Sequence, residues 1–262
     1  MWEDILTKET LLDLITKFIF IQTKEETDER TGKKKIKETL IFPRYHQLDV
    51  IRRLLADLYV NRTTQNYLIQ HSAGSGKTNS IAWLAHRLTS LHNEENKIIF
   101  DNVVIVTDRV VVDRQLQSAV LGMEHKTGLI RVMDEKCTSA DLALALKGNT
   151  KIIATTIQKF PYIVDTVKGL KEKHFAVIID EAHSSTAGKD MAAITMTLGK
   201  GEVSFDTEGT YDSEDVIVDE LARNGKQPNV SMFAFTATPK ATTLELFGRA
   251  NEKGQKQAFH IC

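Results

Sequence analysis

One segment of the chain combines residue types that bind phosphate groups. It reads His71-Ser72-Ala73-Gly74-Ser75-Gly76-Lys77-Thr78 and lies between a short apolar stretch and a helical pattern. The glycines let the backbone turn its N–H groups inward around a phosphate chain, and a helix starting near Lys77 adds the positive end of its dipole. The Lys77 amine would reach the terminal phosphates, and the Thr78 hydroxyl would hold Mg²⁺. We therefore predict a loop for ATP and Mg²⁺, whose contacts are Gly74, Ser75, Gly76, Lys77 and Thr78.

An acidic pair follows the most apolar run of the chain. Residues 175–179 are apolar throughout, and Asp180, Glu181 and His183 come directly after them. A carboxylate at the end of a buried parallel strand, beside a phosphate loop, is placed to bind Mg²⁺ through water. The adjacent Glu181 can orient the attacking water and take its proton. Without the upstream loop, the pair would be interpreted as a solvated strand end.

A third segment, Phe-Thr-Ala-Thr-Pro at 235–239, also follows an apolar stretch. The hydroxyls of Thr236 and Thr238 can hydrogen-bond to Glu181 or His183 and so sense the state of the nucleotide. Without the other two segments, this one would be a strand end followed by a turn. The three together predict a nucleotide-hydrolysing site with a sensor.

In this order, the three segments resemble the motor pattern of superfamily 2 helicases: phosphate loop, DEAH box and TAT motif. The particular variants are similar to those of the R subunit of type I restriction enzymes, in its first RecA-like lobe, and the resemblance covers the chain from about Leu11 onward. The variants are His-x-x-Gly-Ser-Gly-Lys-Thr at 71–78, Thr-Thr-Ile-Gln-Lys-Phe at 155–160, Asp-Glu-Ala-His-Ser-Ser at 180–185 and Phe-Thr-Ala-Thr-Pro-Lys at 235–240. His71 departs from the strict loop pattern, which has glycine there, and helicase-type loops tolerate this.

The resemblance implies a role for each matching residue. Gln47, with Arg44 nearby, would select adenine, although Gln47 can equally be a solvated helix residue. Lys77, Thr78, Asp180, Glu181 and His183 would carry out hydrolysis, with Thr78 and Asp180 as metal ligands. Thr236 and Thr238 would couple the nucleotide to DNA. Contacts to DNA phosphates, which track the duplex without reading its sequence, would come from Thr107, Arg109, Thr155, Thr156 and Gln158. For Thr155 and Thr156 a plain strand end is the alternative.

The same resemblance implies partners and missing parts. The partners would be the backbone of duplex DNA and the modification and specificity subunits of a type I complex. The second motor lobe and the nuclease domain are expected to be absent from this chain. The nuclease signature Glu-x-Lys occurs at 95–97 and 124–126, but both copies lie in polar connections and are interpreted as solvated loops.

Composition limits the function classes. The chain has 262 residues and a formal net charge of -1, so it is not basic as a whole, and a DNA site would have to be a local patch. Its two cysteines, Cys137 and Cys262, predict free reduced thiols in a cytoplasmic protein. No run of apolar residues approaches the roughly 20 that a membrane span needs, and no secretory signal is expected.

The elements that must position these residues alternate between apolar β-branched runs and helical patterns. Strands are predicted at 67–70, 102–107, 129–133, 151–155, 175–180 and 230–235, and helices at 46–59, 77–92, 113–120, 139–146, 189–197 and 213–224. Strands that are apolar on both faces indicate a parallel sheet covered on both sides. The predicted fold class is α/β, a P-loop NTPase with a RecA-like sheet over residues 43–262. Residues 1–42 are predicted to form a helix and a charged hairpin, and residues 199–227 an acidic insertion.

Two other functions remain open from the residues. One is a stand-alone superfamily 2 DNA or RNA helicase or remodelling ATPase. The other is a nucleotide-dependent binding module that no longer hydrolyses ATP, although intact Lys77, Asp180 and Glu181 argue against such decay.

Overall fold

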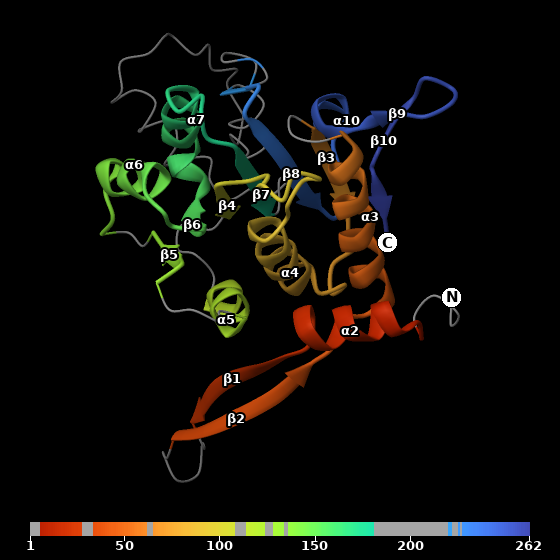
Figure 1. Cartoon of the computed structure of the whole chain (residues 1–262), viewed down its shortest axis with the longest axis vertical. Coiled ribbons are helices and arrows are strands. Elements are labelled where there is room, and N and C mark those ends of the chain that lie inside the picture. The colour runs from red at the N-terminus through yellow and green to blue at the C-terminus, as the bar shows by residue number, and fades with distance from the viewer. Residues whose placement is uncertain are drawn as a thin grey trace, which may run out of the picture.

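The computed structural model describes residues 6–27, 34–61, 65–107, 114–123, 128–133, 136–180, 220–221, 225 and 227–262. Its centre is a seven-stranded sheet in the order β11-β3-β8-β7-β4-β6-β5, in which every neighbouring pair is parallel. The strands are β3 (Asn66–Gln70), β4 (Asn102–Thr107), β5 (Ile130–Val132), β6 (Ile152–Thr156), β7 (Phe175–Asp180), β8 (Val230–Thr236) and β11 (His260–Ile261). Figure 1 shows the sheet between its helices.

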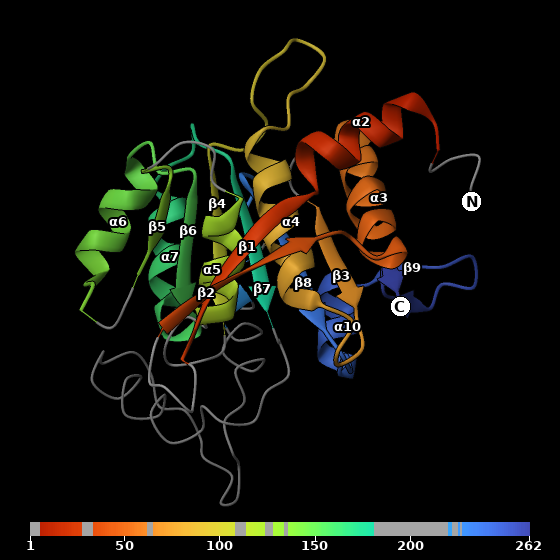
Figure 2. The ribbon, with the colours of Figure 1, turned by 90° about the horizontal axis from the view of Figure 1, so that it is seen from below.

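Helices cover both faces of the sheet (Figure 2). They are α2 (Lys8–Lys17), α3 (Tyr45–Asn61), α4 (Lys77–Thr89), α5 (Arg114–Gly122), α6 (Ser139–Lys147), the 3-10 turn η1 (Ile157–Lys159), α7 (Phe160–Lys168) and α10 (Ala241–Phe247). One core cluster joins the sheet to α3, α4 and α5, and a second joins its other face to α6, α7 and α10. The middle strands β4 and β7 are buried along both faces, which confirms the predicted α/β fold.

The N-terminal segment forms the predicted helix and hairpin. Strands β1 (Phe20–Thr27) and β2 (Lys34–Ile41) pair antiparallel and project from the lobe as a two-stranded ribbon. The base of the ribbon is anchored in the lobe, because the Trp83 indole donates a 2.7 Å hydrogen bond to the Phe18 carbonyl and packs against the rings of Phe18 and Phe20. Leu14 and Phe18 therefore share a core with α4. The domain boundary at residue 42 stays a prediction.

Most predicted elements agree with the structure to within a few residues. Strands β4 and β7 have the predicted bounds, whereas α4 ends at Thr89 instead of residue 92. Helix α7, strand β11 and the short pair β9 (Arg249–Ala250) and β10 (Lys256–Gln257) were not predicted. The predicted helices at 189–197 and 213–224 and the insertion at 199–227 lie almost wholly outside the described residues.

Arg249 lies outside the helices of the lobe. Helix α10 ends at Phe247, and Arg249 begins β9. Its guanidinium binds both carboxylate oxygens of Asp57, at 2.8 and 2.7 Å, and lies over the rings of Tyr67 and Phe259. The hydrogen-bonded Arg249 guanidinium holds the pKa of Asp57 below its usual value. The positive charge of Arg249 is therefore paired within the lobe.

Two smaller expectations, on the loop at 95–97 and on the cysteines, are confirmed. Glu95 and Lys97 form an exposed 2.8 Å ion pair in a turn, as expected for a solvated loop. Both cysteines are free thiols. None of the helices in the described part of the chain combines the length and apolar character that a bilayer crossing requires. The second Glu-x-Lys, at 124–126, lies outside the described residues.

Candidate active site

The predicted motifs meet along the carboxyl edge of the sheet. In the strand register, Thr107 pairs with Thr156 on one side and with Asp180 on the other. Asp180 in turn lies opposite Phe235, and Thr236 lies opposite Gln70, which directly precedes the phosphate loop. Ligands of parallel α/β sheets bind outside this edge. Segments about 160 residues apart in the sequence are therefore brought to one site.

Alternation along each strand decides which side chains share a face. Ile105 of β4 and Ile178 of β7 pack in the core beneath α3, α4 and α5. Two residues further along each strand, Thr107 and Asp180 must point to that same face. Since α4 begins with Lys77, the Asp180 carboxylate lies on the face that carries the phosphate loop.

The loop geometry depends on two glycines. Gly74 and Gly76 have φ values of 78° and 86°, in the left-handed region, and Gly76 is the N-cap of α4. That conformation costs other residues roughly 1–2 kcal/mol. Lys77 and Thr78, the first two residues of α4, are half-buried. The Ser75 hydroxyl is buried and has no hydrogen-bond partner among the described residues.

Side chains from the start of α3 hold the loop in place. The Gln47 amide donates to the Ser75 and Gly76 carbonyls, at 3.3 and 3.0 Å, and its oxygen accepts the Arg44 N–H at 2.8 Å. The Arg44 guanidinium donates to the Gly74 carbonyl at 3.2 Å, and a ring nitrogen of His46 lies 3.0 Å from the Ser75 carbonyl. Gln47 is buried, so it is not the solvated helix residue that the sequence left open.

These contacts predict different costs for two glycine substitutions. A Cβ on Gly76 would lie 2.5 Å from the Gln47 amide nitrogen, whereas one on Gly74 would have no heavy atom within 4 Å. Both alanine variants incur the left-handed strain, but only Gly76→Ala displaces Gln47. We expect Gly74→Ala to lower the free energy of unfolding by about 1 kcal/mol and Gly76→Ala by about 3 kcal/mol, measured by urea denaturation. Adding Gln47→Ala to each variant completes a double-mutant cycle, which measures the coupling free energy between Gln47 and each glycine. A coupling free energy that is the same for Gly74 and Gly76 would contradict the contact between Gly76 and Gln47.

A buried histidine cluster lies beneath the loop. The His71 ring is 5.6 Å, centroid to centroid, from the rings of His46 and His260 and 5.8 Å from that of Phe235. His71 is fully buried, and neither ring nitrogen has a hydrogen-bond partner among the described residues. Burial, followed by the nearby charges of His260, His46 and Lys77, lowers the pKa of His71 to about 4. His71 is therefore neutral near pH 7 and joins the loop to strand β8, which ends in the TAT motif.

Strand β11 adds a second support that the sequence did not reveal. It pairs parallel with β3, and the Ser72 N–H at the start of the loop donates to the Cys262 carbonyl at 3.3 Å. His260 on this strand contacts Asp49 of α3 at 3.2 Å. The histidine at the first loop position was the only sequence signal for this cluster, since its partners lie far away in the chain.

The residues expected to touch DNA are mostly buried. Thr107, Thr155 and Thr156 are at most 6% exposed, and Thr155 points to the α6–α7 face, away from Asp180. These three side chains therefore offer little surface in this structure, and their contacts to DNA phosphates stay a prediction. Gln158 is half-buried. Thr236 is also buried, which suits an internal coupling role, and Thr238 is exposed.

Three predicted site residues, Arg109, Glu181 and His183, lie outside the described residues. Glu181 and His183 directly follow β7, whose last residue, Asp180, is placed at the site. Their proposed roles depend on this position in the sequence.

The donor set fits the expected ATP and Mg²⁺. A hydroxyl at the first turn of α4 and a carboxylate on the same face of the sheet are hard oxygen ligands of the kind that Mg²⁺ takes. The left-handed glycines leave room for a phosphate chain, and the first turn of a helix has N–H groups without intrahelical acceptors. The arrangement suits the binding of a nucleoside triphosphate.

Comparison with known families identifies this arrangement. The sequence profile of the SWI2/SNF2 ATPases matches residues 46–259, which include the loop, the DEAH box and the TAT segment. The chain belongs to the SWI2/SNF2 ATPase family. It is a helicase-like lobe with the P-loop NTPase fold.

Two curated relatives of this SWI2/SNF2 lobe come from Methanocaldococcus jannaschii, and both are named as type I restriction enzyme endonuclease subunits. The first, MjaVIIIP, is 23% identical over 226 residues, which is 79% of this chain and 21% of the relative. The second, MjaVIIP, is 30% identical over 174 residues, which is 60% of this chain and 15% of the relative. They confirm the predicted resemblance to type I R subunits, although this chain spans only a small part of their length.

Solved structures similar to the lobe include three helicase-like proteins. The UvsW helicase of bacteriophage T4 aligns with a TM-score of 0.48 and 14% identity, over 97% of this chain and 68% of its own. The Sulfolobus solfataricus SWI2/SNF2 ATPase core, solved with double-stranded DNA, aligns with a TM-score of 0.43 and 15% identity, over 78% of this chain and 34% of its own. The type ISP restriction-modification enzyme LlaGI, solved with a DNA substrate mimic, aligns with a TM-score of 0.43 and 16% identity, over 75% of this chain and 17% of its own.

Proposed function

We propose that this SWI2/SNF2 lobe binds and hydrolyses Mg–ATP to move duplex DNA, as the motor lobe of a type I restriction endonuclease R subunit. The observation that carries the proposal is the convergence at the carboxyl edge of the sheet. There the phosphate loop and Asp180 occupy the same face, and Thr236 ends the neighbouring strand. The names of the two curated relatives supply the restriction context.

Each residue has a part in the proposed hydrolysis. Lys77 donates to the terminal phosphates as negative charge builds up on them. Thr78 and Asp180 hold Mg²⁺, which neutralises phosphate charge when bound. Glu181 accepts the proton of the attacking water, and His183 hydrogen-bonds to the hydroxyls that follow β8. Thr236 and Thr238 then connect this chemistry to strand β8.

Adenine selection by Gln47 has a specific limit. An amide has two N–H donors and an oxygen with two lone pairs, and in this structure the donors serve the loop while one lone pair accepts from Arg44. One oxygen lone pair remains for the adenine amino group. A base that accepts a hydrogen bond from the Gln47 amide nitrogen would have to break one of its hydrogen bonds to the Ser75 or Gly76 carbonyl. Gln47 therefore links the base to the loop.

The proposed partner is the DNA backbone, contacted without sequence preference. Thr107, Thr155 and Thr156 are buried, so the contacts that we propose first are Gln158, among the described residues, and Arg109, outside them. Modification and specificity subunits complete the proposed complex. We assign the nuclease activity of such an enzyme to a domain other than this motor lobe, as the resemblance implies. This chain covers 21% and 15% of the two named subunits.

The test measures ATP turnover and DNA movement by the full-length protein with its candidate modification and specificity subunits. We expect phosphate release to rise at least about tenfold with duplex DNA, and a triplex-forming oligonucleotide to be displaced from that duplex in an ATP-dependent manner. Stimulation by RNA above that by duplex DNA would instead favour a helicase. Tight ATP binding without any turnover would indicate a binding module, and either result would overturn the proposal.

A further inference from the structure

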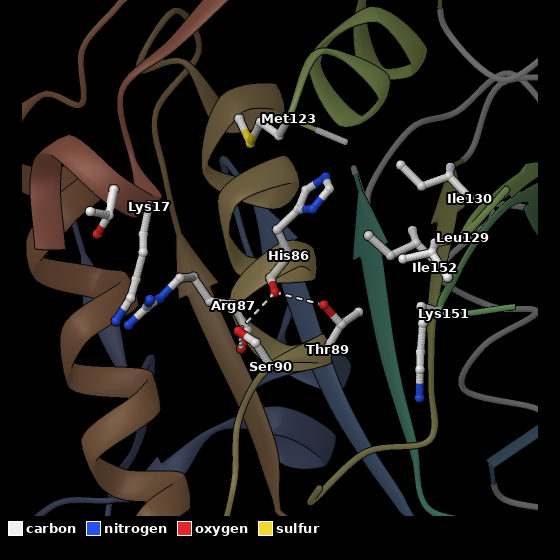
Figure 3. A pocket seen from close by; sticks show the side chains of 11 residues that line it. Lys17, His86, Arg87, Thr89, Ser90, Met123, Leu129, Ile130, Lys151 and Ile152 are labelled. Carbon is white, nitrogen blue, oxygen red and sulfur yellow. Dashed lines mark hydrogen bonds between the residues drawn. The ribbon is translucent and has the colours of Figure 1, made fainter. Parts of the chain in front are cut away.

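A cavity lies at the opposite edge of the sheet from the phosphate loop. It has a volume of about 380 Å³ and lies between α2, the last turn of α4, the end of α5, and the starts of β5 and β6. Figure 3 shows its lining. Helix α4 runs from the loop to this cavity, a length of roughly 20 Å at 1.5 Å per residue. The cavity is therefore separate from the candidate active site.

Cations from three elements line the cavity. Lys17 of α2 and Arg87 of α4 lie side by side on one wall, and Lys151, next to β6, lies on the opposite side (Figure 3). Among the residues that the structure describes, the lining contains no acidic residue. Asp13, behind the first wall, is 2.9 Å from the Lys17 amine and 3.4 Å from the Arg87 guanidinium. Within this described part of the chain, three cations against one shared carboxylate leave a surplus of about two positive charges.

Arg87 is a largely buried cation of this lining. Its side chain is only 17% exposed, and its Nε atom is buried without a hydrogen-bond partner among the described residues. Burial lowers its pKa, which means that the surroundings do not fully compensate the charge. A buried charged group without full compensation is unfavourable. An anion in the cavity would compensate the Arg87 charge at a distance, since the Nε atom itself has no exposed surface.

The remaining wall is apolar. Met123, Leu129, Ile130 and Ile152 face the space between the cations. Such a wall suits a flat apolar body, and ligand sites commonly combine apolar walls with a few polar groups that orient the ligand. The surplus charge matches the roughly two negative charges that a phosphate monoester carries at pH 7.

From this combination, we propose that the cavity binds a small organic phosphate monoester, with its phosphate between Lys17, Arg87 and Lys151 and its apolar body on Met123 and Ile130. The inference does not depend on the proposed motor function. A carboxylate or an isolated inorganic phosphate shares part of this chemistry, and both are compared in the experiment.

The experiment uses methyl NMR on protein labelled at Met and Ile methyl groups, with 1-naphthyl phosphate as the probe. We expect saturable shifts of the Met123 and Ile130 methyls, while Met133 and Met232, in the core on the other face of the sheet, serve as internal references. Probes that lack the phosphate or the naphthyl ring test the cationic part and the apolar part of the site separately. Inorganic phosphate, 1-naphthol and 1-naphthoate should each bind at least about tenfold more weakly, since charged hydrogen bonds and apolar contact both contribute.

Paired variants separate charge from folding. Lys17→Met with Lys151→Met should weaken binding of 1-naphthyl phosphate at least about tenfold, whereas Lys147→Met with Lys171→Met, at exposed lysines outside the cavity lining, should leave it unchanged. Arg87 stays intact in both because its guanidinium also packs over Phe18. Equal affinity for 1-naphthol, unchanged binding in the first pair, or shifts absent from Met123 and Ile130 would each overturn the proposal.

Discussion

Lys77→Ala is expected to lower the affinity for Mg–ATP by about 100-fold, whereas Glu181→Gln should leave it within about threefold and slow turnover by about a thousandfold. The first change removes the cation at the start of α4 that would meet the terminal phosphates. The second leaves the loop intact and removes the proposed base, which directly follows β7.

Calorimetric titration with ATP and steady-state phosphate release of the full-length protein measure the two effects. Lys147→Ala, at an exposed lysine on α6, is the matched control and should change neither quantity. Parallel losses of affinity in Lys77→Ala and Glu181→Gln would show that the roles are assigned wrongly.

His71 should make the stability of the lobe depend on pH. Its pKa is about 4 in the folded chain and near 6.5 when exposed. The unfolded chain therefore takes up a proton first as the pH falls. The contribution is fully present above about pH 6.5 and is lost as the pH falls toward 4. For the quoted values, the loss between pH 7.5 and pH 5 is about 2 kcal/mol of unfolding free energy.

Urea denaturation at the two pH values measures this loss, and His71→Phe should reduce it by about 2 kcal/mol. The groups that face the ring do not reverse the sign, since His46, His260 and Lys77 all oppose its protonation, and the carboxylate of Asp49 contacts His260 instead. His92→Gln, at an exposed histidine, is the control and should keep the full pH dependence. A wild-type pH dependence that survives His71→Phe would contradict the buried neutral state.

The parts of the fold that the sequence predicted well are those with a strong local signal. Strands β4 and β7 are apolar on both faces, so their bounds follow directly from the residues. Helix α7 was missed because Pro161 suggests a break, yet proline is favourable in the first turn of a helix. Behind it, Phe160, Ile163, Val164 and Val167 form a buried stripe at helical spacing.

The candidate site also contains residues that a local sequence pattern predicts and residues that no local pattern reveals. Lys77, Thr78 and Asp180 are tied to local patterns, and the parallel strand register brings their segments together. The histidine cluster depends on strand order, which places residues 46, 71 and 260 together from three parts of the chain. The family resemblance predicts Thr155 and Thr156 as DNA contacts, whereas their burial depends on how α6 and α7 cover the sheet and does not follow from the local sequence.

Strand β11 also has a mechanical consequence. The Phe259 and Cys262 N–H groups donate to Leu68 and Gln70 of β3, and the Cys262 carbonyl accepts from Ser72. Tension applied along this strand loads these hydrogen bonds in shear, so they share the force and do not open one after another. Their acceptors and donor lie on the residues that lead into the phosphate loop. A pull on strand β11 therefore reaches the loop through these hydrogen bonds, before the force spreads to the helices around the sheet.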